Sequence, residues 1–130
     1  MATFTPSMTF NAAGNADASA SLAASAARSF NIDVSAKWLG NLTIKNTPGG
    51  SVSATRGLRV DVYHRYGNSP TTAATASWTI TLPSATASTA EHQRIPVPTG
   101  KWAITMTNID AAQAITVEAT LDTIDSVVSV

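Results

Sequence analysis

The stretch Lys101-Trp-Ala-Ile-Thr-Met-Thr-Asn108, followed by Ala114-Ile-Thr-Val-Glu-Ala-Thr-Leu-Asp122, decides the fold class of this chain. Apolar and polar side chains alternate in both runs, so each run has one face for a core and one for water or a partner. Between the runs, Asn108 and Asp110 are residues that form local Asx-type hydrogen bonds in tight reversals. We therefore predict an antiparallel hairpin of two strands over residues 101–108 and 114–122.

The same alternation recurs upstream, separated by turn-forming segments. It is found over residues 28–35, 42–44, 58–65, 77–82 and 91–97. Pro96 and Pro98 cannot donate hydrogen bonds to a neighbouring strand, so the run over 91–97 is expected at a sheet edge or a strand end. This regular spacing predicts an all-β domain, an antiparallel β-sandwich or jelly-roll-like fold of seven to eight strands.

Residues 1–27 have a different composition, rich in Ala, Ser and Asn. Such a segment is compatible with a flexible arm, a short helix over residues 17–27, or an irregular strand added to a sheet edge. Ser and Asn dilute the helix-forming alanines, and a short isolated helix is marginal in water. We predict an extended N-terminal arm over residues 1–27, which contacts neighbouring subunits, and a β-sandwich domain over residues 28–130.

Charge and cysteine content exclude several classes of function. Eight basic residues balance eight acidic ones, without the basic cluster that nucleic-acid binding requires, so no nucleic-acid partner is expected. The chain has no Cys, which removes disulfides, thiolate zinc sites and cysteine nucleophiles. The sequence also lacks an apolar run of about 18 residues, so no membrane partner is expected.

The sequence contains no recognisable catalytic or cofactor motif. Its two histidines, His64 and His92, have no second ligand at a metal-binding spacing, and no Gly-x-Ser-x-Gly elbow is present. Asp110, Asp122 and Asp125 offer an alternative, a calcium site at one end of the sandwich, but turn capping is the preferred explanation. We predict a protein that is not an enzyme, with no catalytic residue, no cofactor and no metal.

The aromatic residues separate into core and surface candidates. Trp78 and Trp102 are in phase with aliphatic neighbours and are expected in the core. Trp38, Tyr63 and Tyr66 are less constrained, and they are suited either to stacking on sugar rings or to anchoring a protein interface. The candidate interface residues are Phe4, Met8, Phe10, Leu22, Trp38, Tyr63 and Tyr66.

Two segments resemble parts of a known group of proteins. Residues 99–122, Thr99-Gly-Lys-Trp-Ala-Ile-Thr through Thr-Leu-Asp122, resemble the terminal hairpin of small β-sandwich structural proteins of tailed bacteriophages, including head-decoration and tail-associated proteins. Residues 58–66 are similar to an interior strand of such proteins, and the resemblance extends over residues 28–125.

This resemblance implies a non-enzymatic virion structural protein, in the first place a capsid decoration protein that stabilises the particle through subunit contacts. Its implied partners are other copies of itself, as a homo-oligomer, and a major capsid or other virion protein. Its implied location is the virion, assembled in the host cytoplasm. The alternative is a carbohydrate-binding module of a tail fibre or secreted bacterial protein, with Trp38, Tyr63 and Tyr66 as the stacking platform.

Overall fold

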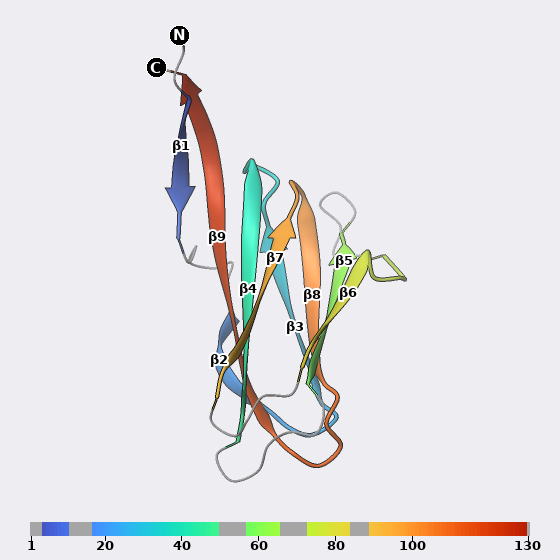
Figure 1. Ribbon diagram of the computed structural model, residues 1–130. Helices are drawn as coiled ribbons and strands as arrows, with labels where there is room; N and C mark the ends of the chain where they lie inside the picture. The colour runs from blue at the N-terminus through green and yellow to red at the C-terminus, as the bar shows by residue number, and fades with distance from the viewer. Residues whose placement is uncertain (1–3, 11–16, 50–56, 66–72, 84–88, 130) are drawn as a thin grey trace.

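The protein is an all-β structure, seen in a computed structural model that describes residues 4–10, 17–49, 57–65, 73–83 and 89–129 (Figure 1). The predicted fold class is confirmed. The strands of the described residues are β1 (Phe4–Thr9), β2 (Asp17–Leu22), β3 (Ala27–Asp33), β4 (Leu39–Pro48), β5 (Leu58–His64), β6 (Trp78–Leu82), β7 (Glu91–Val97), β8 (Lys101–Asn108) and β9 (Ile115–Ser129). Strands β3 to β9 correspond to the predicted sandwich, while β1 and β2 lie in the predicted arm.

The strands form two antiparallel sheets that pack face to face. The first sheet has the order β1-β9-β4-β7, with β2 also paired to β9, and the second has the order β3-β8-β5-β6. Strands β2 and β9, β3 and β8, β4 and β7, and β5 and β6 are therefore neighbours. This nested pairing of eight strands in two sheets is the arrangement of a jelly roll. The edge position predicted for residues 91–97 is also confirmed, because β7 ends the first sheet.

The core lies between the two sheets and follows from the alternation in the sequence. Along β4, Leu42 and Ile44 are fully buried while Thr43 and Lys45 are half-buried on the outer face. The other inward-facing aliphatic side chains come from both sheets and include Val60, Val62, Ile104, Met106, Val117 and Leu121. Asn46 is buried among them without a hydrogen-bond partner for its side-chain amide in the described part of the chain, which locally weakens the core.

The predicted hairpin of residues 101–122 is wrong, because its two strands belong to different sheets. Strand β8 pairs with β3 and β5, whereas β9 pairs with β1, β2 and β4. The Asx chemistry expected between them is present: the Asp110 amide donates to Asn108 Oδ1 at 3.0 Å. Asn108 Nδ2 also donates to the carbonyl oxygen of Gln113 at 2.8 Å and to that of Ala23 at 3.1 Å. The turn between β8 and β9 therefore connects the two sheets instead of two neighbouring strands of one sheet.

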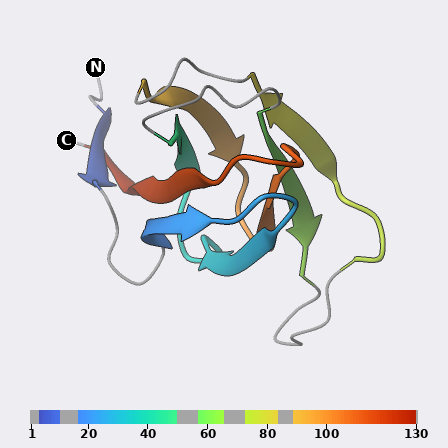
Figure 2. The same cartoon turned by 90° about the horizontal axis from the view of Figure 1, so that it is seen from below.

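The N-terminal region adds strands to the edge of the first sheet, which is the third of the possibilities considered for residues 1–27. Strand β1 pairs with β9 from Thr123 to Ser129, and β2 pairs with β9 from Ile115 to Ala119. Because β4 occupies the other edge of β9, β1 and β2 lie end to end along one edge. Viewed from below, β1 lies at the outer side of β9 (Figure 2).

Candidate interaction surfaces

A two-stranded ribbon extends beyond one end of the sandwich. It consists of β1 and residues 123–129 of β9, and we call it the ribbon (Figure 1). Strand β4 pairs with β9 only as far as Ile124, whose partner on β4 is Leu39. Beyond Ile124, β1 is therefore the strand that pairs with β9 in the described part of the chain. Unpaired strand edges of this kind are templates for pairing with another chain.

An apolar row crosses the base of the ribbon on the outer face of the first sheet. Ile124 of β9 is directly opposite Met8 of β1 on one side and Leu39 of β4 on the other. Directly opposed residues of antiparallel strands share a face, with Cβ atoms about 5 Å apart. Trp38 directly precedes Leu39, and its backbone amide donates to the Ile124 carbonyl oxygen at 2.8 Å. We call Met8, Ile124 and Leu39 the apolar row.

This end of the molecule gathers the exposed large hydrophobic side chains of the described residues. Met8 is 47% exposed, Phe10 is 68% exposed and Trp38 is 66% exposed. Exposed apolar side chains are common when scattered singly, but a group of them in one place marks an interaction surface. The base of the ribbon is therefore the strongest candidate for contact with a partner.

The Asp125 carboxylate connects the ribbon to the body of the sandwich. It accepts hydrogen bonds from the hydroxyl groups of Thr9 in β1 and Thr123 in β9, and it forms an ion pair with Lys37 Nζ at 2.8 Å. The Lys37 ammonium group, followed by the Thr123 and Thr9 hydroxyls, holds the pKa of Asp125 well below its ordinary value. Asp125 therefore stays ionised at neutral pH and fixes the position at which β1 leaves the sandwich.

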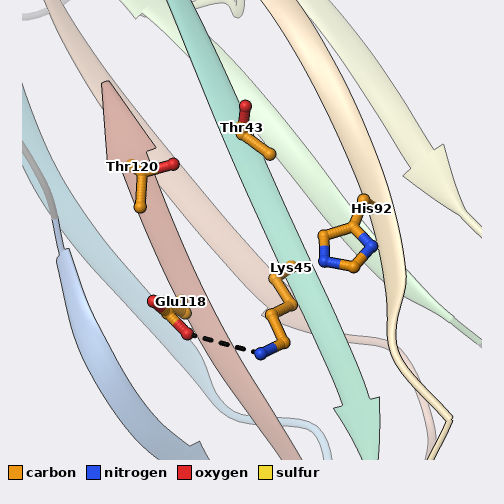
Figure 3. A pocket seen from close by; sticks show the side chains of 5 residues that line it. All are labelled: Thr43, Lys45, His92, Glu118 and Thr120. Atoms are coloured by element: carbon orange, nitrogen blue, oxygen red, sulfur yellow. Dashed lines mark ion pairs between the residues drawn. The ribbon is translucent and has the colours of Figure 1, made fainter. Parts of the chain in front are cut away.

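A second candidate surface is a polar groove of about 330 Å³ on the outer face of the first sheet. Thr43 and Lys45 of β4, His92 of β7, and Glu118 and Thr120 of β9 line it (Figure 3). Lys45 is directly opposite both His92 and Glu118, and its Nζ lies 3.7 Å from Glu118 Oε2. Both side chains of this ion pair are more than one third exposed, so water screens their attraction. The groove offers hydroxyl, ammonium, imidazole and carboxylate groups in one place.

The predicted interface residues fall into different environments. Met8, Phe10 and Trp38 are exposed near the ribbon, as described above. Leu22 is instead a core residue with 5% exposure, because the pairing of β2 with β9 directs its side chain between the sheets. Tyr66 and the side chain of Phe4 lie outside the described part of the protein.

The aromatic residues considered for sugar stacking are not brought together where the structure describes them. Trp38 precedes β4 at the end of the first sheet. Tyr63 lies in β5 of the second sheet, in the phase opposite to the buried Val60 and Val62, which places it on the outer face of that sheet. The described residues therefore do not form the predicted stacking platform.

The two tryptophans predicted for the core, Trp78 and Trp102, pack against it and against each other. Trp102 is buried and Trp78 is partly buried against the core, with ring centroids 5.1 Å apart. His64 packs edge-on against Trp102 at 5.2 Å, and His92 is exposed on β7.

The three aspartates considered for calcium are not brought together. Residues 115–125 of the extended strand β9 span about 33 Å, so Asp110 and Asp125 lie at opposite ends of the sandwich. Asp110 Oδ1 accepts the amide hydrogen bonds of Ala112 at 2.8 Å and Gln113 at 2.7 Å, which is turn capping.

The sequence contained a signal for the apolar row that the prediction did not use. In β9 the inward-facing residues occupy odd positions, including Val117 and Leu121, so the aliphatic Ile124 is out of phase and points outward. Leu39 is likewise out of phase with Leu42 and Ile44 in β4. Several aliphatic residues that adjoin on the polar face of a sheet, as here, mark a candidate interaction surface.

Comparison with known proteins gives no relative: no family model and no curated protein sequence matches this chain. The described ranges contain no cluster of His, Asp or Glu side chains that could hold a metal ion. They also contain no helix able to cross a membrane.

Proposed function

We propose that this protein is a non-enzymatic structural component of a bacteriophage virion, and that it acts as a capsid decoration protein. Its partners are other copies of itself and a major capsid or other virion protein, and its place is the virion, assembled in the host cytoplasm. The observation that carries the proposal is the ribbon, with exposed Met8, Phe10 and Trp38 gathered at its base. This surface is suited to packing against another protein.

The charge distribution supports the same function. The net charge is zero, and charged residues make up 12% of the chain, so copies repel one another little at close range. Hydroxyl side chains recur on the outer sheet faces, for example Ser29, whose Oγ lies 2.8 Å from Thr105 Oγ1. A particle surface places many copies side by side, and weak contacts between them then add through multivalency. The jelly-roll fold occurs in capsid domains and also in lectins, so the fold alone does not decide the function.

The first experiment is quantitative mass spectrometry of purified particles from the source of the sequence. We expect this chain in a ratio near one to the major capsid protein, because a decoration protein covers the whole lattice. A few copies per particle would place the protein in the tail, and its absence from the particles would refute a virion function.

The second experiment tests whether the base of the ribbon provides the contact. The variant Met8→Ser/Trp38→Ser is expected to bind particles about tenfold less tightly or weaker still, since buried apolar anchors carry most of the binding energy at interfaces. The matched control is Lys45→Ser/His92→Ser, which changes two side chains of the polar groove on the same sheet. Equal losses in the two variants would contradict a contact through the ribbon.

A carbohydrate-binding function is the second candidate, and the polar groove is the observation that favours it. Thr43, Lys45, His92, Glu118 and Thr120 supply donors and acceptors for sugar hydroxyls on one face. A glycan array probed with the wild type and with Lys45→Ser/His92→Ser tests this function directly. Binding that disappears in this variant and persists in Met8→Ser/Trp38→Ser would favour the carbohydrate-binding module.

A further inference from the structure

We propose that β1 is an exchangeable strand, which in the assembled protein pairs with β9 of a neighbouring copy of this chain. In this arrangement it occupies the same edge that it occupies on its own β9 in the isolated chain. The inference rests on the proposed assembly function and adds to it the segment, the partner surface and the register of the contact.

The fit between β1 and this edge identifies the partner as a second copy. The strands pair from Phe4 opposite Ser129 to Thr9 opposite Thr123, with a shift in register between Ser7 and Met8. The Thr9 hydroxyl donates to the Asp125 carboxylate at the base of the ribbon. A β1 strand from another copy carries the same residues, so it forms the same backbone pairs and the same hydrogen bond in trans.

Exchange of β1 leaves the core of the sandwich intact. Among the described elements, β9 is the one with which β1 makes extensive contact, whereas β2 also contacts β3. Met8 is about half exposed and Phe10 is mostly exposed, whereas Leu22 of β2 belongs to the core. Moving β1 to another copy therefore removes no buried side chain of the described core from its own sandwich.

The connection between β1 and β2 is long enough for β1 to leave its own β9. Residues 10–16 join Thr9 to Asp17, and an extended chain over this interval reaches about 27 Å. The residues of β9 opposite these two positions, Thr123 and Ala119, are separated by about 13 Å along the strand. The connection is thus about twice as long as pairing within one chain requires.

Pairing in trans also covers the surface that the isolated chain leaves exposed. A projecting two-stranded ribbon is marginally stable in water on its own, and a neighbouring sandwich beside it supplies further contacts. The apolar row, Phe10 and Trp38 then lie at the junction between two copies, where burial of Met8, Phe10 and Trp38 favours association. Reciprocal exchange closes a dimer, and exchange in one direction gives a ring or a longer chain.

The test is disulfide trapping with two singly substituted chains. The natural sequence has no Cys, so each introduced thiol is unique in its chain. One preparation carries Met8→Cys and the other Ile124→Cys; these positions are directly opposed, at a spacing compatible with a disulfide. The two are mixed at high concentration, oxidised and separated by non-reducing electrophoresis. The matched control mixes Lys45→Cys with Glu118→Cys, an equally direct pair between β4 and β9 inside the sheet.

Exchange predicts a Met8→Cys to Ile124→Cys heterodimer at least tenfold more abundant than the control heterodimer. Exchange would be overturned by a heterodimer no more abundant than the control heterodimer, or by a predominance of Met8→Cys homodimers. It would also be overturned if a chain carrying both Met8→Cys and Ile124→Cys formed only the disulfide within one chain at every protein concentration. The readout uses the purified protein alone. A chain that is abundant in particles but gives no specific heterodimer would therefore refute exchange and leave the virion function standing.

Discussion

Strands β1 and β2 pair with the same edge of β9, but they relate to the sandwich in different ways. Strand β2 contributes the buried Leu22, and the Asp17 carboxylate binds Arg28 of β3 through two hydrogen bonds, of 2.6 and 2.7 Å. The Arg28 ion pair thus ties the first sheet to the second. Strand β1 has exposed side chains at Met8 and in the adjoining Phe10, and among the described residues its side-chain hydrogen bond is the one from Thr9 to Asp125, within the ribbon itself.

The difference shows that backbone pairing alone does not make a strand part of a folding unit. Both strands have partners for their backbone groups on β9, but β2 also buries an apolar side chain between the sheets. Because apolar burial is the main favourable term in folding, β2 is expected to fold with the sandwich and β1 to separate from it at low cost. A strand that separates easily is available for a partner.

The largest expected effect comes from two N-terminal deletions. Removal of residues 1–10 takes away β1 and should leave a cooperative melting transition near that of the full chain. Removal of residues 1–27 also takes away β2, with Leu22 and the Asp17 partner of Arg28. This deletion should cost about 4 kcal/mol or more, a large part of the stability of a small domain.

The measurement is denaturant unfolding followed by tryptophan fluorescence, which reports on the packed Trp78 and Trp102. Equal midpoints for the two deletions would mean that β2, like β1, is dispensable, and that the sandwich begins at residue 28 as the sequence predicted. A large loss of stability in the variant that lacks residues 1–10 would instead mean that β1 is part of the folding unit.

A smaller effect is expected from single substitutions in the two strands. Leu22→Ala removes a side chain that is buried in the core and should cost about 2–4 kcal/mol. Met8→Ala removes a side chain that is 47% exposed and should change the free energy of unfolding by about 0.5 kcal/mol or less. Urea unfolding of both variants at one protein concentration measures the contrast, and costs of similar size would contradict it.

Much of the fold could be predicted from alternation in the sequence, because one buried face per strand is a local property. The strands around Ile32, Val60, Ile80 and Ile104 were located in this way. The pairing of those strands is not local. Residues 101–108 and 114–122 satisfy every local rule for a hairpin, but each run finds its neighbours elsewhere in the chain, and Asn108 anchors the crossing between the sheets.

The N-terminal region escaped prediction for a related physical reason. Its small residues give a weak alternation, and the edge of β9 that orders β2 lies about one hundred residues further along the chain. Three of the predicted interface candidates are exposed: Met8 and Phe10 were chosen for their place in the arm, and Trp38 as a less constrained aromatic residue. The cluster around Asp125 was not, because Thr9, Lys37 and Asp125 are distant in sequence and meet only after the jelly roll has formed.

The smallest expected effect is a pH dependence that comes from Asp125. The folded protein holds the pKa of this carboxyl well below its ordinary value, chiefly through Lys37, so the unfolded chain binds a proton at higher pH than the folded one. The stabilisation is therefore complete above the unfolded pKa of about 4 and decreases as the pH falls below it. Asp125→Asn removes the titrating group, so the stability difference between wild type and variant should be larger at pH 6 than at pH 3.

The pH dependence of hydrogen exchange in β1 distinguishes the contribution of Thr9 to the Asp125 cluster from that of Lys37 and Thr123. The Thr9 hydroxyl belongs to β1, whereas Lys37 and Thr123 remain beside Asp125 when β1 leaves. Acid should therefore destabilise the end of the sandwich more than it releases β1. Linkage to one carboxyl can accelerate an opening reaction by at most about tenfold per pH unit. Beyond the intrinsic change with pH, hydrogen exchange at the amides of Met8 and Thr9 should therefore accelerate by much less than this limit as the pH falls. Thr9→Val should make this acid-dependent acceleration smaller still. An acceleration close to the limit in the wild type would mean that the whole cluster opens together with β1, and that Asp125 controls exchange of the strand.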